Sequence, residues 1–184
     1  MKYGSIAICS HSEAPQRIAN VRAVISIWDK NGVSVAYADG VPELSLAFND
    51  IDYAPDDFDS PTCEHLMSAL NFARAHAVEA LMVCCHAGVS RSTAVALAII
   101  ADRLEPGDER NAVDALLLLR PQAKVNLLLL DYADRILMRD GRLVEAWFSF
   151  ENAKPEFAIW RRRKHLLGKF GGSVGATDSR LLGR

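Results

Sequence analysis

The segment from Ala80 to Leu104 constrains the fold more than any other part of the chain. Its first part, ALMVCC (Ala80–Cys85), is a short apolar run of the kind that forms a buried strand. Its last part, RSTAVALAIIADRL (Arg91–Leu104), is apolar on nearly every side, so a helix there must be surrounded by other elements. We therefore expect a strand that leads through the loop HAGVS into a helix in the middle of the domain.

The rest of the pattern indicates an α/β fold. Strands are predicted at SIAICS (Ser5–Ser10), AVISIWD (Ala23–Asp29) and ELSLAFND (Glu43–Asp50), and helices at Thr62–Ala77, Glu109–Leu119 and Asn126–Met138. Strands alternate with helices in the first half of the chain, and the second half is helical. This order predicts a central, mostly parallel sheet flanked by helices.

The size and charge of the chain fit one globular domain. At 184 residues the chain can bury a sizeable core, which we place at residues 1–150, followed by a basic C-terminal tail at residues 151–184. The net charge of −2 gives no general attraction to nucleic acid or to a membrane. The four cysteines suggest neither a disulfide framework nor a zinc pair, and no segment is typical of a signal peptide or a membrane span. We expect a cytoplasmic protein with reduced thiols.

The end of the chain has a different composition. The segment Trp160–Arg184 is basic and rich in glycine and serine, which predicts a flexible tail. In an alternative interpretation, Arg161, Arg162, Arg163 and Lys164 dock on an acidic surface, such as a lipid headgroup or a partner.

The loop between Cys85 and Arg91 has the features of an oxyanion site. The first turn of a helix offers unpaired amide N–H groups, and a loop wrapped in front of it adds more. Gly88 lies in mid-loop, where the backbone needs a positive φ or a close approach to a ligand. Arg91 can grip two phosphate oxygens at once. Cys85 lies at the base of this nest, where the same field favours a thiolate nucleophile.

The pattern Cys85-x5-Arg91-Ser92, with Gly88 inside it, resembles the loop of the protein tyrosine phosphatase superfamily. The letters CHAGVSRST are most similar to those of dual-specificity phosphatases, and the chain resembles a small bacterial branch of predicted tyrosine phosphatases. The segment LRPQAKVN resembles the Arg-Pro…Pro-Asn segment of that family, with Val125 in place of the second proline. The resemblance covers roughly Ser5 to Trp147 and leaves out the basic tail.

The spacing selects Cys85 as the nucleophile, because six residues instead of five would separate Cys84 from Arg91. Cys84 stands where the family usually has a histidine. We expect Cys84 to point to the opposite face of the strand and to pack as a small apolar residue. The alternative is a resolving thiol that protects Cys85 from oxidation, supplied by Cys84, Cys9 or Cys63.

The resemblance also implies an aspartic acid that protonates the leaving group, on a loop roughly thirty residues before the nucleophile. The letters FNDIDYAPDDFD offer five aspartates there. Asp50 is our choice, because it follows a strand as the family's acid does, and Asp52 is the second candidate. Three more, Asp56, Asp57 and Asp59, lie deeper in the loop, where one could cap the next helix.

The resemblance implies hydrolysis of phosphotyrosine, with phosphoserine and phosphothreonine as further substrates, through a cysteinyl-phosphate. Arg91 would bind the phosphate together with the amides of His86, Ala87, Gly88, Val89, Ser90 and Arg91. Ser92 would hydrogen-bond the departing thiolate. No cofactor or metal is expected, and the substrate is a phosphorylated protein or a small phosphomonoester. The loop contains no lysine, which favours phosphoproteins over phosphoinositides.

Two other functions use similar residues. A phosphate-binding module without turnover fits a loop in which Cys84 replaces histidine and the acid is ambiguous. A rhodanese-like sulfurtransferase also cradles a cysteine in an amide loop, but Arg91-Ser92, the buried helix and the upstream aspartates argue against it.

Overall fold

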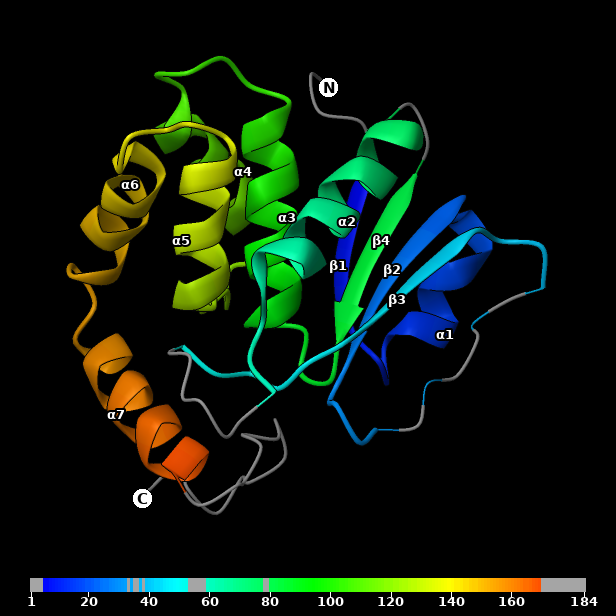
Figure 1. The fold of residues 1–184 in the computed structure, drawn as a ribbon, viewed down its shortest axis with the longest axis horizontal. Coiled ribbons are helices and arrows are strands. Elements are labelled where there is room, and N and C mark those ends of the chain that lie inside the picture. Colours follow the sequence, from blue (N-terminus) through cyan, green and yellow to red (C-terminus); the bar gives the residue numbers. More distant parts are fainter. Residues whose placement is uncertain are drawn as a thin grey trace.

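The computed structural model describes residues 5–32, 34, 37, 39–52, 59–77 and 80–169. Its core is a parallel sheet of four strands, β1 (Ile6–Ser10), β2 (Ala23–Trp28), β3 (Glu43–Ala47) and β4 (Leu81–Cys85). Their order in the sheet is β1-β4-β2-β3, and every pairing is parallel (Figure 1). The predicted α/β class and mostly parallel sheet are confirmed.

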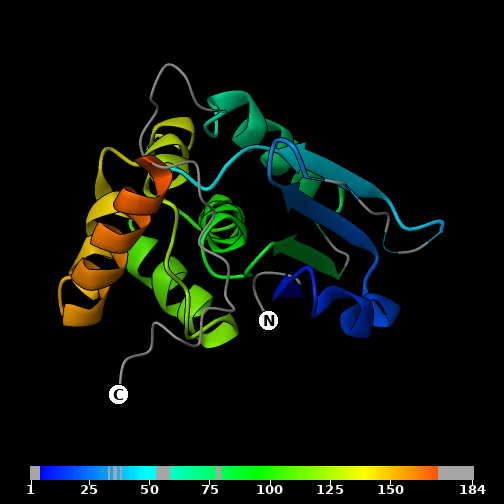
Figure 2. The ribbon, with the colours of Figure 1, turned by 90° about the horizontal axis from the view of Figure 1, so that it is seen from below.

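Helices cover the two faces of the sheet unequally (Figure 2). The helices are α1 (Ala14–Arg17), α2 (Cys63–Ala75), α3 (Arg91–Asp102), α4 (Glu109–Leu119), α5 (Leu127–Ile136), α6 (Arg142–Glu151) and α7 (Pro155–Lys169), with a 3-10 turn at Ile18–Asn20. The short α1 and the 3-10 turn lie on one face, and the bulk of the helices lies on the other. Every residue of α3 except Asp102 is buried, as its apolar sequence predicts.

Alternation along β4 separates the two neighbouring cysteines. Leu81, Val83 and Cys85 belong to the large core between the sheet and the helices. Met82 and Cys84 belong to the small core on the opposite face. Because successive strand residues point to opposite faces, Cys84 and Cys85 cannot serve the same site.

Polar side chains fix the starts of α2 and α5. The Thr62 hydroxyl accepts a hydrogen bond from the His65 amide, and the His65 ring accepts one from the Thr62 amide. The Asn126 side-chain oxygen accepts a hydrogen bond from the Leu129 amide at 3.0 Å. These caps satisfy amides that have no partner within their own helix.

The third strand and the end of the chain differ from expectation. Strand β3 ends at Ala47, so Phe48 to Asp50 lie beyond the carboxyl end of the sheet. The prediction of a flexible tail from Trp160 is wrong as far as Lys169, because these residues belong to α7. Helix α7 begins at Pro155, a residue that favours the first turn of a helix. None of the described helices is long and apolar enough to cross a membrane.

Candidate active site

The loop between β4 and α3 turns its carbonyl groups outward. The Arg120 Nε donates a hydrogen bond to the Gly88 carbonyl at 3.0 Å. The Thr93 hydroxyl lies 2.7 Å from the Val89 carbonyl oxygen and 2.8 Å from the Ser90 carbonyl oxygen. Because each peptide unit carries its N–H opposite its C=O, these contacts favour amides that face the inside of the loop.

The amides of this loop are available to a ligand. Among the described residues, no backbone carbonyl or side chain accepts a hydrogen bond from the amides of residues 86–91. The loop lies at the N-terminus of the twelve-residue helix α3, where the helix dipole is positive. Loop and helix together form a nest for an oxyanion of phosphate size.

Gly88 allows the loop to approach β1 closely. Its φ is +67°, in the left-handed region that favours glycine. A Cβ atom at this position would lie 2.5 Å from the Cys9 carbonyl carbon and 2.5 Å from the Ser10 nitrogen. Glycine is therefore required here for both its conformation and its size.

Cys85 ends β4 at the base of the nest. Its side chain is buried, and its thiol donates a hydrogen bond to the Ser92 hydroxyl at 3.1 Å. Ser92 is the second residue of α3 and is itself fully buried. The structure brings these two predicted site residues into direct contact, at the positive end of the helix.

Cys84 packs in the small core on the other face of the sheet. Its thiol donates a weak hydrogen bond to the Ile25 carbonyl at 3.8 Å, and Cys9 is its register partner on β1. Contact with Cys9 and burial raise the pKa of the Cys84 thiol. Both Cys84 and Cys9 lie on the face opposite Cys85, which favours the packing interpretation over a resolving role for these two thiols.

Arg91 is buried, and one nitrogen of its guanidinium, Nη1, has partners within the protein. Its Nη1 donates to the Phe48 carbonyl at 2.7 Å and to the Asp29 carboxylate at 2.8 Å. Its Nε is also buried, and no partner for it exists among the described residues. A buried donor without a partner is costly, so this edge of Arg91 suits an anionic ligand.

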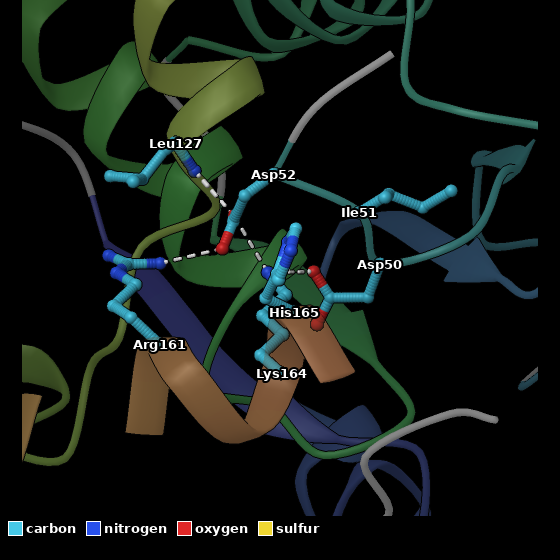
Figure 3. Close-up of a pocket in the computed structure, with 7 residues that line it drawn as sticks. All are labelled: Asp50, Ile51, Asp52, Leu127, Arg161, Lys164 and His165. Atoms are coloured by element: carbon cyan, nitrogen blue, oxygen red, sulfur yellow. Dashed lines mark hydrogen bonds and ion pairs between the residues drawn. The ribbon is translucent and has the colours of Figure 1, made fainter. Parts of the chain in front are cut away.

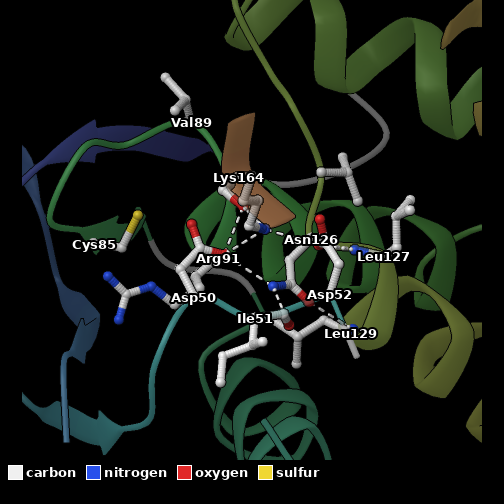
Figure 4. Close-up of polar contacts among 12 residues, drawn as sticks. Asp50, Ile51, Asp52, Cys85, Val89, Arg91, Asn126, Leu127, Leu129 and Lys164 are labelled. Carbon is white, nitrogen blue, oxygen red and sulfur yellow. Dashed lines mark hydrogen bonds and ion pairs between the residues drawn. The ribbon is translucent and has the colours of Figure 1, made fainter. Parts of the chain in front are cut away.

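Asp50 lies beyond the end of β3, surrounded by donors. Its Oδ1 accepts hydrogen bonds from Ser90 Oγ at 2.8 Å and Asn126 Nδ2 at 2.9 Å, and pairs with Lys164 Nζ at 2.8 Å (Figure 4). Burial would raise the pKa of Asp50, but the Lys164 ammonium, the Arg91 guanidinium and these hydrogen bonds outweigh it and lower the pKa well below its usual range. The described arrangement therefore presents Asp50 as a carboxylate.

Asp52 connects the loop after β3, here called the acid loop, to the helices α5 and α7 (Figure 3). Its Oδ1 accepts hydrogen bonds from the Leu127 amide, at the start of α5, and from Lys164 Nζ, each at 2.8 Å. Its Oδ2 pairs with Arg161 Nη1 at 3.0 Å. These contacts describe a structural link between the loop, α5 and α7.

The other candidate residues lie apart from this network. Asp56 and Asp57 fall outside the described residues, and Asp59 is half-exposed and pairs with Lys30 at 3.5 Å. The His86 side chain is exposed, so only its amide can belong to the nest. In the described part of the chain, no group of three or more His, Cys, Asp or Glu could hold a metal ion.

Local sequence patterns do not indicate two of the ion pairs at the site. Asp29 was seen only as the end of a strand, although β2 and β4 are adjacent and the carboxyl ends of parallel strands share one edge. Lys164 was assigned to the tail, and no local pattern connects it with Asp50 across more than one hundred residues.

The arrangement of sheet and helices is shared with solved structures of known proteins. The four-stranded parallel sheet, the buried helix α3 and the loop between β4 and α3 match the fold of solved dual-specificity phosphatases. The chain is similar to DUSP15, with 16% identity and a TM-score of 0.58 over 85% of this chain and 96% of that one. It is similar to human DUSP28, with 19% identity and a TM-score of 0.57 over 78% and 97%.

A further similar structure is PTPMT1 in complex with PI(5)P, with 19% identity and a TM-score of 0.53 over 74% of this chain and 94% of that one. No family model matches the chain. A search of curated proteins also finds no match. The likeness to solved structures therefore establishes the fold, and the function rests on the site.

Proposed function

We propose that this chain hydrolyses phosphate monoesters through a cysteinyl-phosphate intermediate. The observation that carries the proposal is the contact between Cys85 and Ser92 at the base of a loop whose amides have no acceptor among the described residues, with the buried Arg91 beside it. A nucleophile, an oxyanion nest and a bidentate cation are the parts that phosphoryl transfer to sulfur needs.

The first step transfers the phosphoryl group to sulfur. The phosphate dianion binds the amides of residues 86–91 and the free edge of Arg91. The Cys85 thiolate attacks phosphorus in line, the phosphorus–oxygen bond of the ester breaks, and a protonated Asp50 gives its proton to the departing oxygen. The amides and Arg91 balance the charge that develops on the phosphoryl oxygens.

The second step releases phosphate. Asp50, now a carboxylate, accepts a proton from a water molecule that attacks the phosphorus of the cysteinyl-phosphate. The sulfur–phosphorus bond breaks, and the Ser92 hydroxyl donates a hydrogen bond to the departing Cys85 thiolate. The 3.1 Å distance between Ser92 Oγ and Cys85 Sγ supports this role.

Phosphoproteins are the proposed substrates, with phosphotyrosine first and phosphoserine and phosphothreonine as further possibilities to test. The loop itself contains no lysine or arginine between Cys85 and Arg91, so it offers no extra charge for a multiply phosphorylated inositol. The similar structures include DUSP15 and human DUSP28, and also PTPMT1 in complex with PI(5)P, so phosphopeptides and phosphoinositides should be compared directly.

A second candidate function is binding of a phosphorylated protein without turnover. The observation that favours it is the contact of Asp50 with Ser90, Asn126 and Lys164, because these groups stabilise its carboxylate, and a carboxylate cannot protonate a leaving group. A human tyrosine phosphatase-like serine/threonine/tyrosine-interacting protein is also among the similar structures, at 16% identity and a TM-score of 0.53.

Phosphate release from an aryl phosphate decides between these functions. The assay compares the wild-type chain with Cys85→Ser and Cys84→Ser under reducing conditions and with a chelator present. Turnover that only Cys85→Ser abolishes supports the phosphatase. A wild-type chain that is inactive from pH 5 to 8, yet binds a phosphopeptide, supports the binding module instead.

A further inference from the structure

Lys164 of α7 reaches the candidate active site. Its side chain is 4% exposed, and its Nζ lies 2.8 Å from Asp50 Oδ1, 2.8 Å from Asp52 Oδ1 and 3.1 Å from Ser90 Oγ. Ser90 belongs to the phosphate-binding loop, and Asp50 is the proposed acid. One ammonium group from α7 therefore contacts both the phosphate-binding loop and the proposed acid, which must cooperate in phosphoryl transfer.

Neighbouring contacts hold α7 in this position. Arg161, one turn before Lys164, pairs with Asp52 at 3.0 Å and with Glu151 at 2.7 Å, and donates to the Val125 carbonyl at 2.9 Å. These bonds involve charges that are mostly buried, so solvent screens them less than a surface pair. The position of Lys164 is thus set by its helix and does not depend on Asp50 alone.

Charged and polar groups from three helices and from its own loop surround Asp50. Lys164 approaches from α7, Arg91 from α3 and the Asn126 amide from the start of α5. Asp52 of the same loop shares Lys164. Further groups near this contact are Ser90 of the phosphate-binding loop, Arg161 on Asp52, and His165, which lines the adjacent pocket.

Lys164 has room to leave this position. A pocket of about 190 Å³ lies beside it, lined by Asp50, Ile51, Asp52, Leu127, Arg161, Lys164 and His165 (Figure 3). This pocket places open space beside the buried ion pair of Lys164 and Asp50, and the lysine side chain has several rotatable bonds and a compact charge.

We propose that Lys164 is an inhibitory positioning residue, which holds the Asp50 carboxyl group in an ion pair beside the phosphate-binding loop and thereby restrains the proton-donating step. The inference rests on the proposed phosphatase function. It follows from the chemistry of the two steps, because the first needs a proton on Asp50 and the second needs its carboxylate. Substrates whose leaving oxygen is strongly basic depend most on the first step.

Two matched variants test this inference. Lys164→Met removes the ammonium and keeps a long side chain, and Arg162→Met removes an exposed cation from the same helix. Phenyl phosphate has a poor leaving group, phenoxide, which needs a proton from the acid. With this substrate we expect Lys164→Met to raise kcat/KM at pH 7 by at least about tenfold, because a rise of one unit in the pKa of the acid raises its protonated fraction about tenfold. With 4-nitrophenyl phosphate, which needs less proton donation, the expected rise is below about twofold. Arg162→Met should change neither value.

The alkaline limb of the pH profile gives an independent readout. Lys164→Met should move that limb of kcat/KM for phenyl phosphate to higher pH, because the acid stays protonated longer. An equal change for both substrates, an unmoved limb, or the same effect in Arg162→Met would show a structural role and overturn the inference.

A titration that does not need turnover separates this inference from the proposed function. In a Cys85→Ser background, the ¹³C carboxyl signal of Asp50 should titrate at higher pH in Lys164→Met than with Lys164 present. An unchanged titration overturns the inference. If neither the wild-type chain nor Lys164→Met shows turnover, the proposed phosphatase function fails and the inhibitory role fails with it, while the titration still shows whether Lys164 keeps Asp50 ionised.

Discussion

Replacing Gly88 by alanine tests whether the phosphate-binding loop depends on its contact with β1. The residue has a φ of +67°, a conformation that costs an L-residue about 1–2 kcal/mol. The new methyl group would also lie 2.5 Å from backbone atoms of Cys9 and Ser10, which the sheet holds in place, and such overpacking costs about 1–3 kcal/mol more. We expect Gly88→Ala to lower the free energy of unfolding by about 2–5 kcal/mol, a large part of the about 5–15 kcal/mol typical of a domain.

Gly141→Ala is the matched control for this variant. Gly141 has a φ of +84°, but a Cβ atom there would meet nothing within 4 Å. In both variants alanine must adopt a positive φ, which destabilises the folded state. In both it also lowers the conformational entropy of the unfolded chain, which is a smaller stabilising effect. Urea denaturation, followed by circular dichroism, measures both free energies of unfolding. If the two variants lose the same free energy of unfolding within about 0.5 kcal/mol, the close contact between Gly88 and β1 is refuted, because effects at separate sites are additive only to about that value.

Three further changes have defined outcomes. Asp29→Asn removes the charge that pairs with Arg91 at 2.8 Å and should lower kcat/KM about tenfold, a loss of about 1.4 kcal/mol in transition-state stabilisation. Asp59→Asn is the control and should leave kcat/KM unchanged. Similar values for both variants would exclude the anchoring role of Asp29. Because the pKa of Asp50 is lowered in the folded chain, its carboxylate adds stability above its unfolded pKa of about 3.9, and this is lost as the pH falls toward the folded pKa. Urea midpoints between pH 3 and 6 should therefore fall more steeply with decreasing pH in the wild-type chain than in Asp50→Asn, and parallel curves would contradict the lowered pKa. Thr62→Ala removes the cap of α2 and should cost about 1 kcal/mol in the same denaturation assay, with no loss counting against the cap.

The strands and most helices follow from local pattern. The helix predicted at Glu109–Leu119 is α4 with the same bounds, and the buried helix predicted at Arg91–Leu104 is α3, which ends at Asp102. Helix and strand periods are properties of neighbouring residues, so a short window of sequence contains them. The end of β3 at Ala47 was not visible in this way, because pairing with β2 decides where the ladder stops.

The site residues also fall into those that local sequence predicts and those that it does not. Cys85, Gly88, Arg91 and Ser92 lie within eight residues of one loop, so the resemblance of this short pattern to a phosphatase loop was enough to predict them. Their observed contacts, such as that between Cys85 and Ser92, agree with that selection. The proton donor is different, because the aspartates near Asp50 have similar local surroundings in the sequence.

By itself, the sequence determined the strand–loop–helix unit and the parallel α/β class, and it supports the proposed phosphate-binding chemistry of the loop, because each depends on residues close together in the chain. Only the tertiary structure decided that Asp29 anchors Arg91 and that Lys164 and Asn126 surround Asp50. These are pairs between elements far apart in the chain. A charged side chain has many solvated alternatives in the unfolded state, and only packing of α5 and α7 against the acid loop selects one partner.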